Sequence, residues 1–158
     1  MRTTFTILVF LFSIGYLNAQ IYVYEGKSSF SSDIIYNLKN SKVYKKRSSF
    51  SSDIVCNIQG NKIYKGRSSF SSDVIYTIED GNVYKGNSSF RSDIVFSIKD
   101  GQIFEGSSTF QSDVIATIRD GKVYSGRSSF SSDILFTIDG YVTLIEFVAI
   151  WHAVNYCY

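Results

Sequence analysis

The sequence contains no proline and very few of the side chains from which reactive sites are usually built. Among its 158 residues there are one histidine, one methionine, one tryptophan and two cysteines. A catalytic or metal centre assembled from several histidines or cysteines is therefore excluded. Because proline is absent, no strand loses a backbone N–H donor to it.

The net charge is also small. The 16 lysine and arginine residues are opposed by 14 aspartate and glutamate residues. This near balance excludes a strongly basic nucleic-acid-binding protein, so we expect no nucleic acid as a partner. Hydrophobic residues, by contrast, make up 44% of the chain and aromatic residues 16%. Those proportions are sufficient for a packed core, and the length is typical of one globular domain.

Residues 1–19 have the pattern of an export signal. Arg2 precedes an apolar run at residues 7–12, and the small residue Ala19 ends the segment. We predict a signal peptide that is cleaved after Ala19. The apolar run is too short to cross a bilayer, so we expect no transmembrane segment in the mature chain. The predicted location is secreted, periplasmic or on the extracellular surface.

Export has two covalent consequences. Cys56 and Cys157 would lie where a disulfide can form, but their spacing does not decide whether they pair or remain two buried thiols. Both alternatives stay open at this point. Asn87 begins a glycosylation sequon, which matters only in a source that glycosylates exported proteins.

The body of the chain, residues 20–142, consists of tandem repeats. Six units of twenty residues follow one another without a gap from Ile21 to Gly140. Every unit has an invariant serine, a phenylalanine two residues later, and a Ser-Asp pair. The phenylalanines are Phe30, Phe50, Phe70, Phe90, Phe110 and Phe130, and the aspartates are Asp33, Asp53, Asp73, Asp93, Asp113 and Asp133. One local conformation is therefore built six times.

Each unit contains two short strand patterns. Residues 83–86 (Val-Tyr-Lys-Gly) exemplify the first and residues 54–58 (Ile-Val-Cys-Asn-Ile) the second, both of them rich in β-branched and aromatic residues. Asp-Gly separates the second strand of one unit from the first strand of the next at residues 80–81, 100–101 and 120–121. Both residue types tolerate positive φ, which predicts type I′ hairpins across the unit boundaries. Twelve short strands then form a meander.

The second connection in each unit is a serine-rich loop, with the sequence R-S-S-F-S-S-D in units two, three and six. We expect its serines and aspartate to hydrogen-bond to the loop's own backbone, and its phenylalanine to anchor the loop in the core. In the second strand, the first, third and fifth positions are apolar in nearly every unit, and the fourth is Asn, Thr or Ser. This alternation predicts one buried face and one solvent-exposed face.

A helix is expected after the repeats, over residues 143–158. Thr143 and Glu146 have the spacing of a capping box, which predicts that the helix begins at Leu144. Apolar side chains then surround most of the cylinder and leave a narrow polar line that includes His152. A helix with so many apolar sides is buried in the protein, and at about 22 Å it is too short to span a bilayer.

Strands and helix together predict a closed structure. Closing twelve strands into a ring or barrel removes the unpaired edges, but it leaves an interior too wide for the strand side chains to fill. A helix of about 10–12 Å diameter would fill that space. The middle residue of the second strand is small only in units two and five, as Cys56 and Ala116. These units are opposite in a six-unit ring, which favours an elongated interior for a helix that carries Trp151 on one side.

The predicted fold class is therefore mainly β, with six tandem two-stranded units in a closed radial ring or barrel around a buried C-terminal helix. Tandem hairpins with D-G-x-V-Y-x-G, at residues 80–86 and 120–126, after a signal peptide and before an apolar helix, resemble the secreted beta-flower repeat proteins. That resemblance implies hairpin petals around an axis and supplies no activity or site. A helix inside a barrel also resembles the tubby-type fold, but the strands here are much shorter. MORN repeats share the Tyr-x-Gly and Asp-Gly elements but have longer units. Choline-binding repeats have a similar period but depend on tryptophan, which no unit here contains.

The six Ser-Asp pairs are interpreted as loop caps rather than as ligands. Calcium needs six to eight oxygen ligands, and each unit offers one carboxylate. Lys27, Arg47, Arg67 and Arg127 precede the loops and can neutralise the aspartates. We therefore expect no metal and no cofactor. A small exported hydrolase is a further alternative, but the nucleophile elbow is missing and His152 lies on the helix that we expect to be enclosed. We expect no catalytic residues and no enzyme.

An aromatic column is the candidate for ligand recognition. Its members are Tyr24, Tyr44, Tyr64, Tyr84, Phe104 and Tyr124. Tyrosine combines a flat apolar body with a polar tip, and repetition would give several equal sites. The alternative is that these rings pack between neighbouring hairpins. The first functional hypothesis is a secreted, non-enzymatic repeat module for binding or surface structure, and the second is a lectin-like protein. The partner would be a glycan or a protein at the cell surface.

Overall fold

The computed structural model describes residues 20–157. Short and longer strands alternate along the repeats, and one helix follows them. The elements are β1 (Ile21–Glu25), β2 (Ile34–Lys39), β3 (Lys42–Lys45), β4 (Ile54–Gln59), β5 (Lys62–Lys65), β6 (Val74–Glu79), β7 (Asn82–Lys85), β8 (Ile94–Lys99), β9 (Gln102–Glu105), β10 (Val114–Arg119), β11 (Lys122–Ser125), β12 (Ile134–Asp139) and α1 (Leu144–Tyr156). The predicted signal peptide, residues 1–19, lies outside the described residues.

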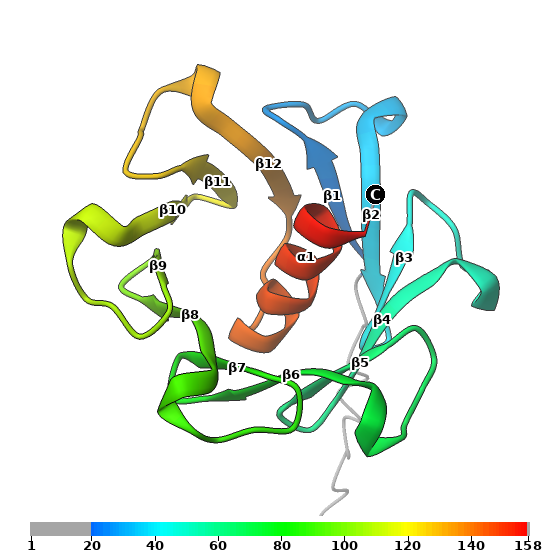
Figure 1. Ribbon diagram of the computed structural model, residues 1–158. Helices are drawn as coiled ribbons and strands as arrows, with labels where there is room; N and C mark the ends of the chain where they lie inside the picture. The colour runs from blue at the N-terminus through cyan, green and yellow to red at the C-terminus, as the bar shows by residue number, and fades with distance from the viewer. Residues whose placement is uncertain (1–19, 158) are drawn as a thin grey trace, which may run out of the picture.

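The twelve strands form a closed antiparallel barrel, as predicted (Figure 1). Each strand pairs with its neighbours in sequence, and β1 also pairs with β12. Val23 of β1, for example, lies opposite Tyr36 on one side and opposite Ile138 on the other. Among residues 20–157, closure pairs both edges of every strand, which removes the hazard that an open sheet of this size would present.

The hairpins cross the unit boundaries as predicted. In the β6–β7 hairpin, Glu79 pairs with Asn82, which leaves Asp80 and Gly81 as the two-residue turn. Their φ angles are +49° and +80°, and positive φ at both positions is what a type I′ turn requires. A Cβ at Gly81 would lie 2.7 Å from the carbonyl oxygen of Ile98, so a side chain does not fit there.

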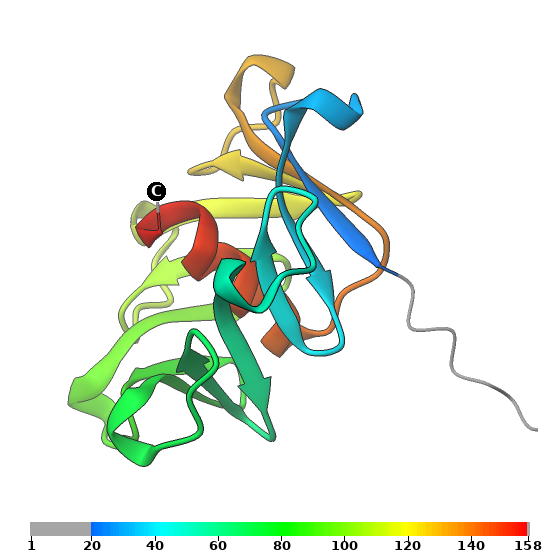
Figure 2. The same ribbon diagram turned by 90° about the vertical axis from the view of Figure 1, so that its right-hand side faces the viewer.

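The C-terminal helix lies inside the barrel (Figures 1 and 2). Its buried side chains include Phe147, Val148, Ile150 and Trp151, and they form one hydrophobic cluster with the inward-facing residues of the strands. The prediction of a buried helix is confirmed. The helix fills an interior that the strand side chains alone would leave empty.

The two ends of α1 differ in how well the sequence predicted them. The helix begins at Leu144, because the Glu146 carboxylate accepts hydrogen bonds from the backbone N–H and the hydroxyl of Thr143, each at 2.8 Å. It ends at Tyr156 rather than continuing to residue 158. Cys157 leaves the helical region with φ −125° and ψ 35°.

The small residue of unit two lies beside the helix backbone, and the indole of Trp151 lies on the side of unit five. The helix lies nearest to β2–β5, on the side of Cys56. On the other side Trp151 sits between Phe96 and Phe136, with ring centroids 6.3 and 6.2 Å away. These two phenylalanines belong to the units on either side of Ala116, so the indole occupies the space that the small residue leaves.

The prediction of a solvent-exposed face on the second strands is wrong. Asn37, at the fourth position of β2, is fully buried, and its amide donates hydrogen bonds to the carbonyl oxygens of Lys46 and Ser48 at 2.8 and 2.9 Å. Thr77 of β6 donates in the same way to Gly86. The loop of the next unit folds back over this face. The carbonyl groups of that loop are then shielded from water, so they need hydrogen-bond donors from the strand.

The connections alternate between the two ends of the barrel. The two-residue turns lie at one end, which we call the hairpin end, and the serine-rich loops lie at the other, which we call the loop end. Leu144 lies beside Gly60 at the hairpin end, whereas Cys157 lies beside Ser32 at the loop end, so α1 runs from one end to the other. Within residues 20–157, no helix is long and apolar enough to cross a membrane.

Candidate binding surface

Each serine-rich loop is held in one conformation by its own hydrogen bonds. In the first unit, the Ser28 hydroxyl donates to the Asp33 carboxylate at 2.5 Å and accepts from the backbone N–H of Phe30 at 3.1 Å. The Ser32 hydroxyl donates to the other carboxylate oxygen at 2.7 Å. The invariant serine and aspartate are joined in the same way in all six units.

The aspartates of the loops therefore cap their own loops. Hydrogen bonds from Ser28 and Ser32 lower the pKa of Asp33, because they favour the ionised carboxylate. Asp113 and Asp133 have lowered pKa values for the same reason. Within residues 20–157, no group of three or more His, Cys, Asp or Glu side chains is arranged to hold a metal ion.

The prediction that the loop phenylalanines anchor the loops in the core is wrong. Their side chains are 71–73% exposed and are among the most exposed large apolar groups of the described chain. The six loop phenylalanines are Phe30, Phe50, Phe70, Phe90, Phe110 and Phe130. Two causes explain the difference: α1 already fills the interior, and the serine and aspartate hydrogen bonds close the loop without help from the ring.

The six exposed rings are presented in nearly identical geometry. The backbone angles of the six phenylalanines lie between −82° and −76° for φ and between 136° and 142° for ψ. Each ring is preceded by an exposed hydroxyl residue, which is serine in five units and Thr109 in the other. The residue that follows is an exposed serine except for Arg91 and Gln111. Each loop thus offers one apolar ring between polar groups.

The predicted aromatic column lies elsewhere. The rings are 5–9% exposed, apart from the half-buried Tyr64; the buried members are Tyr24, Tyr44, Tyr84, Phe104 and Tyr124. In the strand register Tyr44 lies opposite Asn37, and it follows the core-facing Val43, so strand alternation places it on the outer side of the barrel. The structure does not bring the six rings together, because they are distributed around that outer layer.

Two members of the column nevertheless border surface grooves. Phe104 lines a groove of about 310 Å³ together with Ser97 and Ser108. Tyr84 lines another of about 330 Å³ together with Arg91 and Ser107. Both grooves lie between the fourth and fifth units, next to the loops that carry the exposed phenylalanines.

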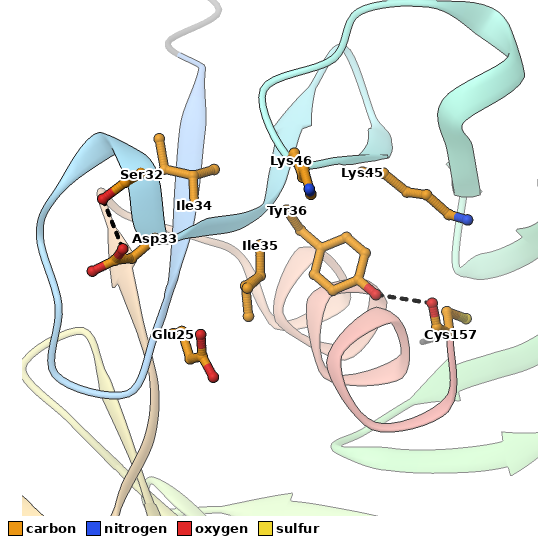
Figure 3. A pocket seen from close by; sticks show the side chains of 9 residues that line it. All are labelled: Glu25, Ser32, Asp33, Ile34, Ile35, Tyr36, Lys45, Lys46 and Cys157. Atoms are coloured by element: carbon orange, nitrogen blue, oxygen red, sulfur yellow. Dashed lines mark hydrogen bonds between the residues drawn. The ribbon is translucent and has the colours of Figure 1, made fainter.

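A further groove, of about 390 Å³, lies at the loop end, beside Cys157 at the end of α1 (Figure 3). Glu25, Asp33, Lys45 and Lys46 contribute charged side chains to it. In its wall the hydroxyl of Tyr36 donates a hydrogen bond to the carbonyl oxygen of Cys157 at 3.0 Å, which ties the end of the helix to β2.

The two cysteines are both free. Cys56 is buried, and burial raises the pKa of its thiol to about 12. Cys157 is partly exposed, and its pKa is raised by burial although the ammonium group of Lys45 opposes the effect. Neither thiol is activated as a nucleophile, because activation requires a lowered pKa.

The sole histidine points along the interior rather than toward a serine nucleophile. His152 Nδ1 lies 3.4 Å from the hydroxyl of Tyr76, and the two rings meet edge to face. The ring of Tyr156 lies on another side, at 5.6 Å between centroids. Burial lowers the pKa of His152 and so favours the neutral imidazole.

Sequence reasoning missed the loop phenylalanines as candidate binding residues. A signal was present, because S-S-F-S-S places a single apolar residue between polar neighbours on both sides, with no apolar partner at strand spacing. The sequence nevertheless favours an anchor at this position, because large apolar residues are usually buried.

The fold defines a class of protein in which two-stranded petals radiate around a central helix. Comparison with protein families gives the same result: the sequence matches the family described as 6-fold beta flower protein over residues 23–151. The chain belongs to this family, which confirms the resemblance found in the sequence. Comparisons with curated proteins and with solved structures found no significant match. The family is a repeat family and not a known enzyme family.

Proposed function

We propose that the protein is an exported, non-enzymatic module that binds glycans through its six phenylalanine loops. The observation that carries the proposal is the 71–73% exposure of six phenylalanine rings on loops of the same geometry. An exposed apolar ring is unfavourable in water, and six equal ones held in fixed positions favour a surface that a ligand covers.

The composition of the loops favours a glycan as the ligand. An aromatic ring can pack against the C–H face of a sugar, while neighbouring hydroxyl groups exchange hydrogen bonds with the hydroxyls of the sugar. Ser29 and Ser31 flank Phe30 in this way, and both are exposed. Six weak sites on one rigid barrel would bind a repetitive glycan far more tightly than one site does, because the later contacts are intramolecular.

The test is a glycan array probed with the protein and with a variant in which all six loop phenylalanines are changed to serine. We expect the variant to lose binding, because the apolar contact surface is gone. Val95, Ile115 and Leu135 are exposed by 38–41% on the strands, so a triple serine variant at these positions is the matched control. Unchanged glycan binding by the six-serine variant would refute the proposal.

The tyrosine column remains the second candidate site, because Tyr84 and Phe104 border grooves. Changing its five tyrosines to phenylalanine removes the polar tips but keeps the packing. If this variant lost glycan binding while the six-serine variant kept it, the site would lie in the grooves and not on the loop phenylalanines.

A further inference from the structure

One column of the repeat divides the loop end into two halves of different charge. The position at the end of the first strand of each unit is lysine in three consecutive units, as Lys45, Lys65 and Lys85, and all three are exposed. In the other three units the same position is Glu25, Glu105 or Ser125. In the barrel only β4 separates β3 from β5, and only β6 separates β5 from β7, so the three lysines lie on adjacent units.

The loops that follow strengthen this division. Residues 45–53, 65–73 and 85–93 contain seven cationic side chains and three carboxylates. The corresponding residues 25–33, 105–113 and 125–133 contain two cationic side chains and five carboxylates. We call the first three segments the basic arc. The three carboxylates in it, Asp53, Asp73 and Asp93, already accept hydrogen bonds from serines of their own loops.

Lys46, inside the basic arc, occupies a backbone conformation that favours glycine. Its φ is +52°, and the same position is glycine in the other five units. A lysine there costs about 1 kcal/mol relative to glycine, and it places a second cation next to Lys45. Its neighbour Arg47 is also held in place, with its guanidinium carbon 5.8 Å from the centre of the Tyr22 ring.

The basic arc also contains three of the exposed rings, Phe50, Phe70 and Phe90. Corresponding residues of adjacent units are two strands apart, which is about 10 Å at the barrel wall, and more where the loops diverge. A chain molecule that follows the rim therefore meets a lysine and a ring at regular intervals. The groove that contains Lys45 and Lys46 lies at one end of this path, and the groove with Arg91 lies at the other.

We infer that the ligand of the phenylalanine loops is an acidic polysaccharide, bound along the basic arc. This inference rests on the proposed function, and it adds the charge and the shape of the ligand. A linear polyanion can contact three neighbouring units and avoid the acidic half of the rim. A flat anionic membrane would press on all six loops, where the two halves nearly cancel.

The test compares two polymers with the same backbone, dextran sulfate and dextran, by affinity electrophoresis. We expect the protein to bind dextran sulfate at least about tenfold more tightly than dextran, and this preference to weaken as salt is raised from 50 to 200 mM. The variant Lys45→Glu/Lys65→Glu/Lys85→Glu should lose at least about tenfold in affinity for dextran sulfate, because the charge opposite the ligand is reversed.

The matched control changes the same number of charges at the other end of the barrel. Lys42 and Lys62 begin β3 and β5, and Lys122 begins β11, so Lys42→Glu/Lys62→Glu/Lys122→Glu reverses three lysines at the hairpin end. We expect it to weaken binding less than about threefold. Equal losses in the two triple variants would overturn the inference, because binding would then follow net charge alone.

Further outcomes separate this inference from the proposed function. If dextran and dextran sulfate bind equally, and the six-serine variant loses both, the phenylalanine loops bind glycans but the ligand is not acidic, so only the inference fails. If the six-serine variant still binds both polymers, the proposed function fails. Tighter binding of single-stranded DNA or of phosphatidylserine vesicles than of dextran sulfate would overturn the assignment to a polysaccharide.

Discussion

The thiol of Cys56 lies 3.8 Å from the carbonyl oxygen of Ala149, so the backbone of α1 passes directly beside β4. The equivalent residues in units one and three are Tyr36 and Tyr76, which could not be accommodated at that distance. The small residue in unit two therefore sets the position of the helix within the barrel. Trp151 then fills the opposite side.

Replacing Cys56 with tyrosine should destabilise the protein. A ring at this position would overlap the helix backbone, and overpacking of this kind costs about 1–3 kcal/mol or more. Chemical denaturation measures the free energy of unfolding. Cys56→Ala is the control, with a smaller loss of about 1 kcal/mol. A tyrosine variant as stable as the parent would mean that α1 can move freely inside the barrel, against the packing described above.

Trp151 should be the most important single side chain of the helix for stability. It is 5% exposed, stacks on Phe147, and contacts the tilted rings of Phe96 and Phe136 on two strands. Trp151→Ala removes these contacts and leaves a cavity, at an expected cost of about 3–5 kcal/mol in thermal or denaturant unfolding. Tyr156→Ala, at a position 64% exposed, should cost less than about 0.5 kcal/mol.

The same reasoning applies to the helix as a whole. Deletion of residues 144–158 should unfold or aggregate the protein, because the interior of the barrel would be left without its filling. A soluble remainder with undiminished stability would show that the strands pack without the helix.

Gly81 and Gly60 allow the cost of positive φ to be separated from the cost of a steric clash at the Cβ. Gly81 and Gly60 both have positive φ, at +80° and +60°, but only at Gly81 does a Cβ meet a backbone oxygen, that of Ile98 at 2.7 Å. Gly60→Ala should therefore cost about 1 kcal/mol and Gly81→Ala about 2–3 kcal/mol, measured as unfolding free energies. Equal costs would mean that the clash is relieved by a small backbone shift.

Much of the architecture could be predicted because it depends on local sequence signals. The Asp-Gly turns require positive φ wherever they occur, and Thr143 with Glu146 defines a helix start within four residues. Closure followed from two simple requirements, that strand edges be paired and that a helix with apolar sides be enclosed. Cys56 and Ala116 lie in opposite units of the ring, and the indole of Trp151 lies on the side of Ala116.

The errors arose where the outcome depends on how a loop folds over a distant strand. An alternating strand looks the same in sequence whether its polar face meets water or, as at Asn37, meets carbonyl groups of the next loop. Likewise, an invariant phenylalanine such as Phe30 can be an anchor or an exposed contact, and only the packing of the loop distinguishes the two. The candidate binding surface was missed for that reason.

Asn57 tests the corrected description of the strand face. Its amide donates to the carbonyl oxygens of Gly66 and Ser68, both at 2.9 Å. Asn57→Ala removes this donor from the covered Gly66 carbonyl and leaves the Ser68 carbonyl only the more distant amide of Gln59, at 3.3 Å. We therefore expect a loss of about 1–3 kcal/mol in unfolding free energy. Ser97 occupies the same position in unit four and is half-buried, and Ser97→Ala should change stability by less than about 0.5 kcal/mol. A neutral Asn57→Ala variant would restore the original prediction of a solvated face.

Alkaline pH should destabilise the barrel through its buried acids. Burial raises the pKa of Cys56 and that of Tyr76 to about 12 each, from ordinary values near 9 and 10. The folded protein therefore keeps protons that the unfolded chain releases, and its stability, fully present below about pH 9, falls as the pH rises toward 12. Denaturant titrations at pH 7 to 10.5 measure the decline.

The contribution of each acid can be separated by substitution. Cys56→Ala should lower the stability at neutral pH but make its decline between pH 9 and 10 shallower, since the thiol no longer titrates. Tyr76→Phe should flatten the decline above pH 10 in the same way. Tyr141→Phe, whose ring is 89% exposed, is the control and should leave the pH profile unchanged. If the profile of Cys56→Ala runs parallel to that of the parent protein, the buried thiol is not the source of the alkaline sensitivity.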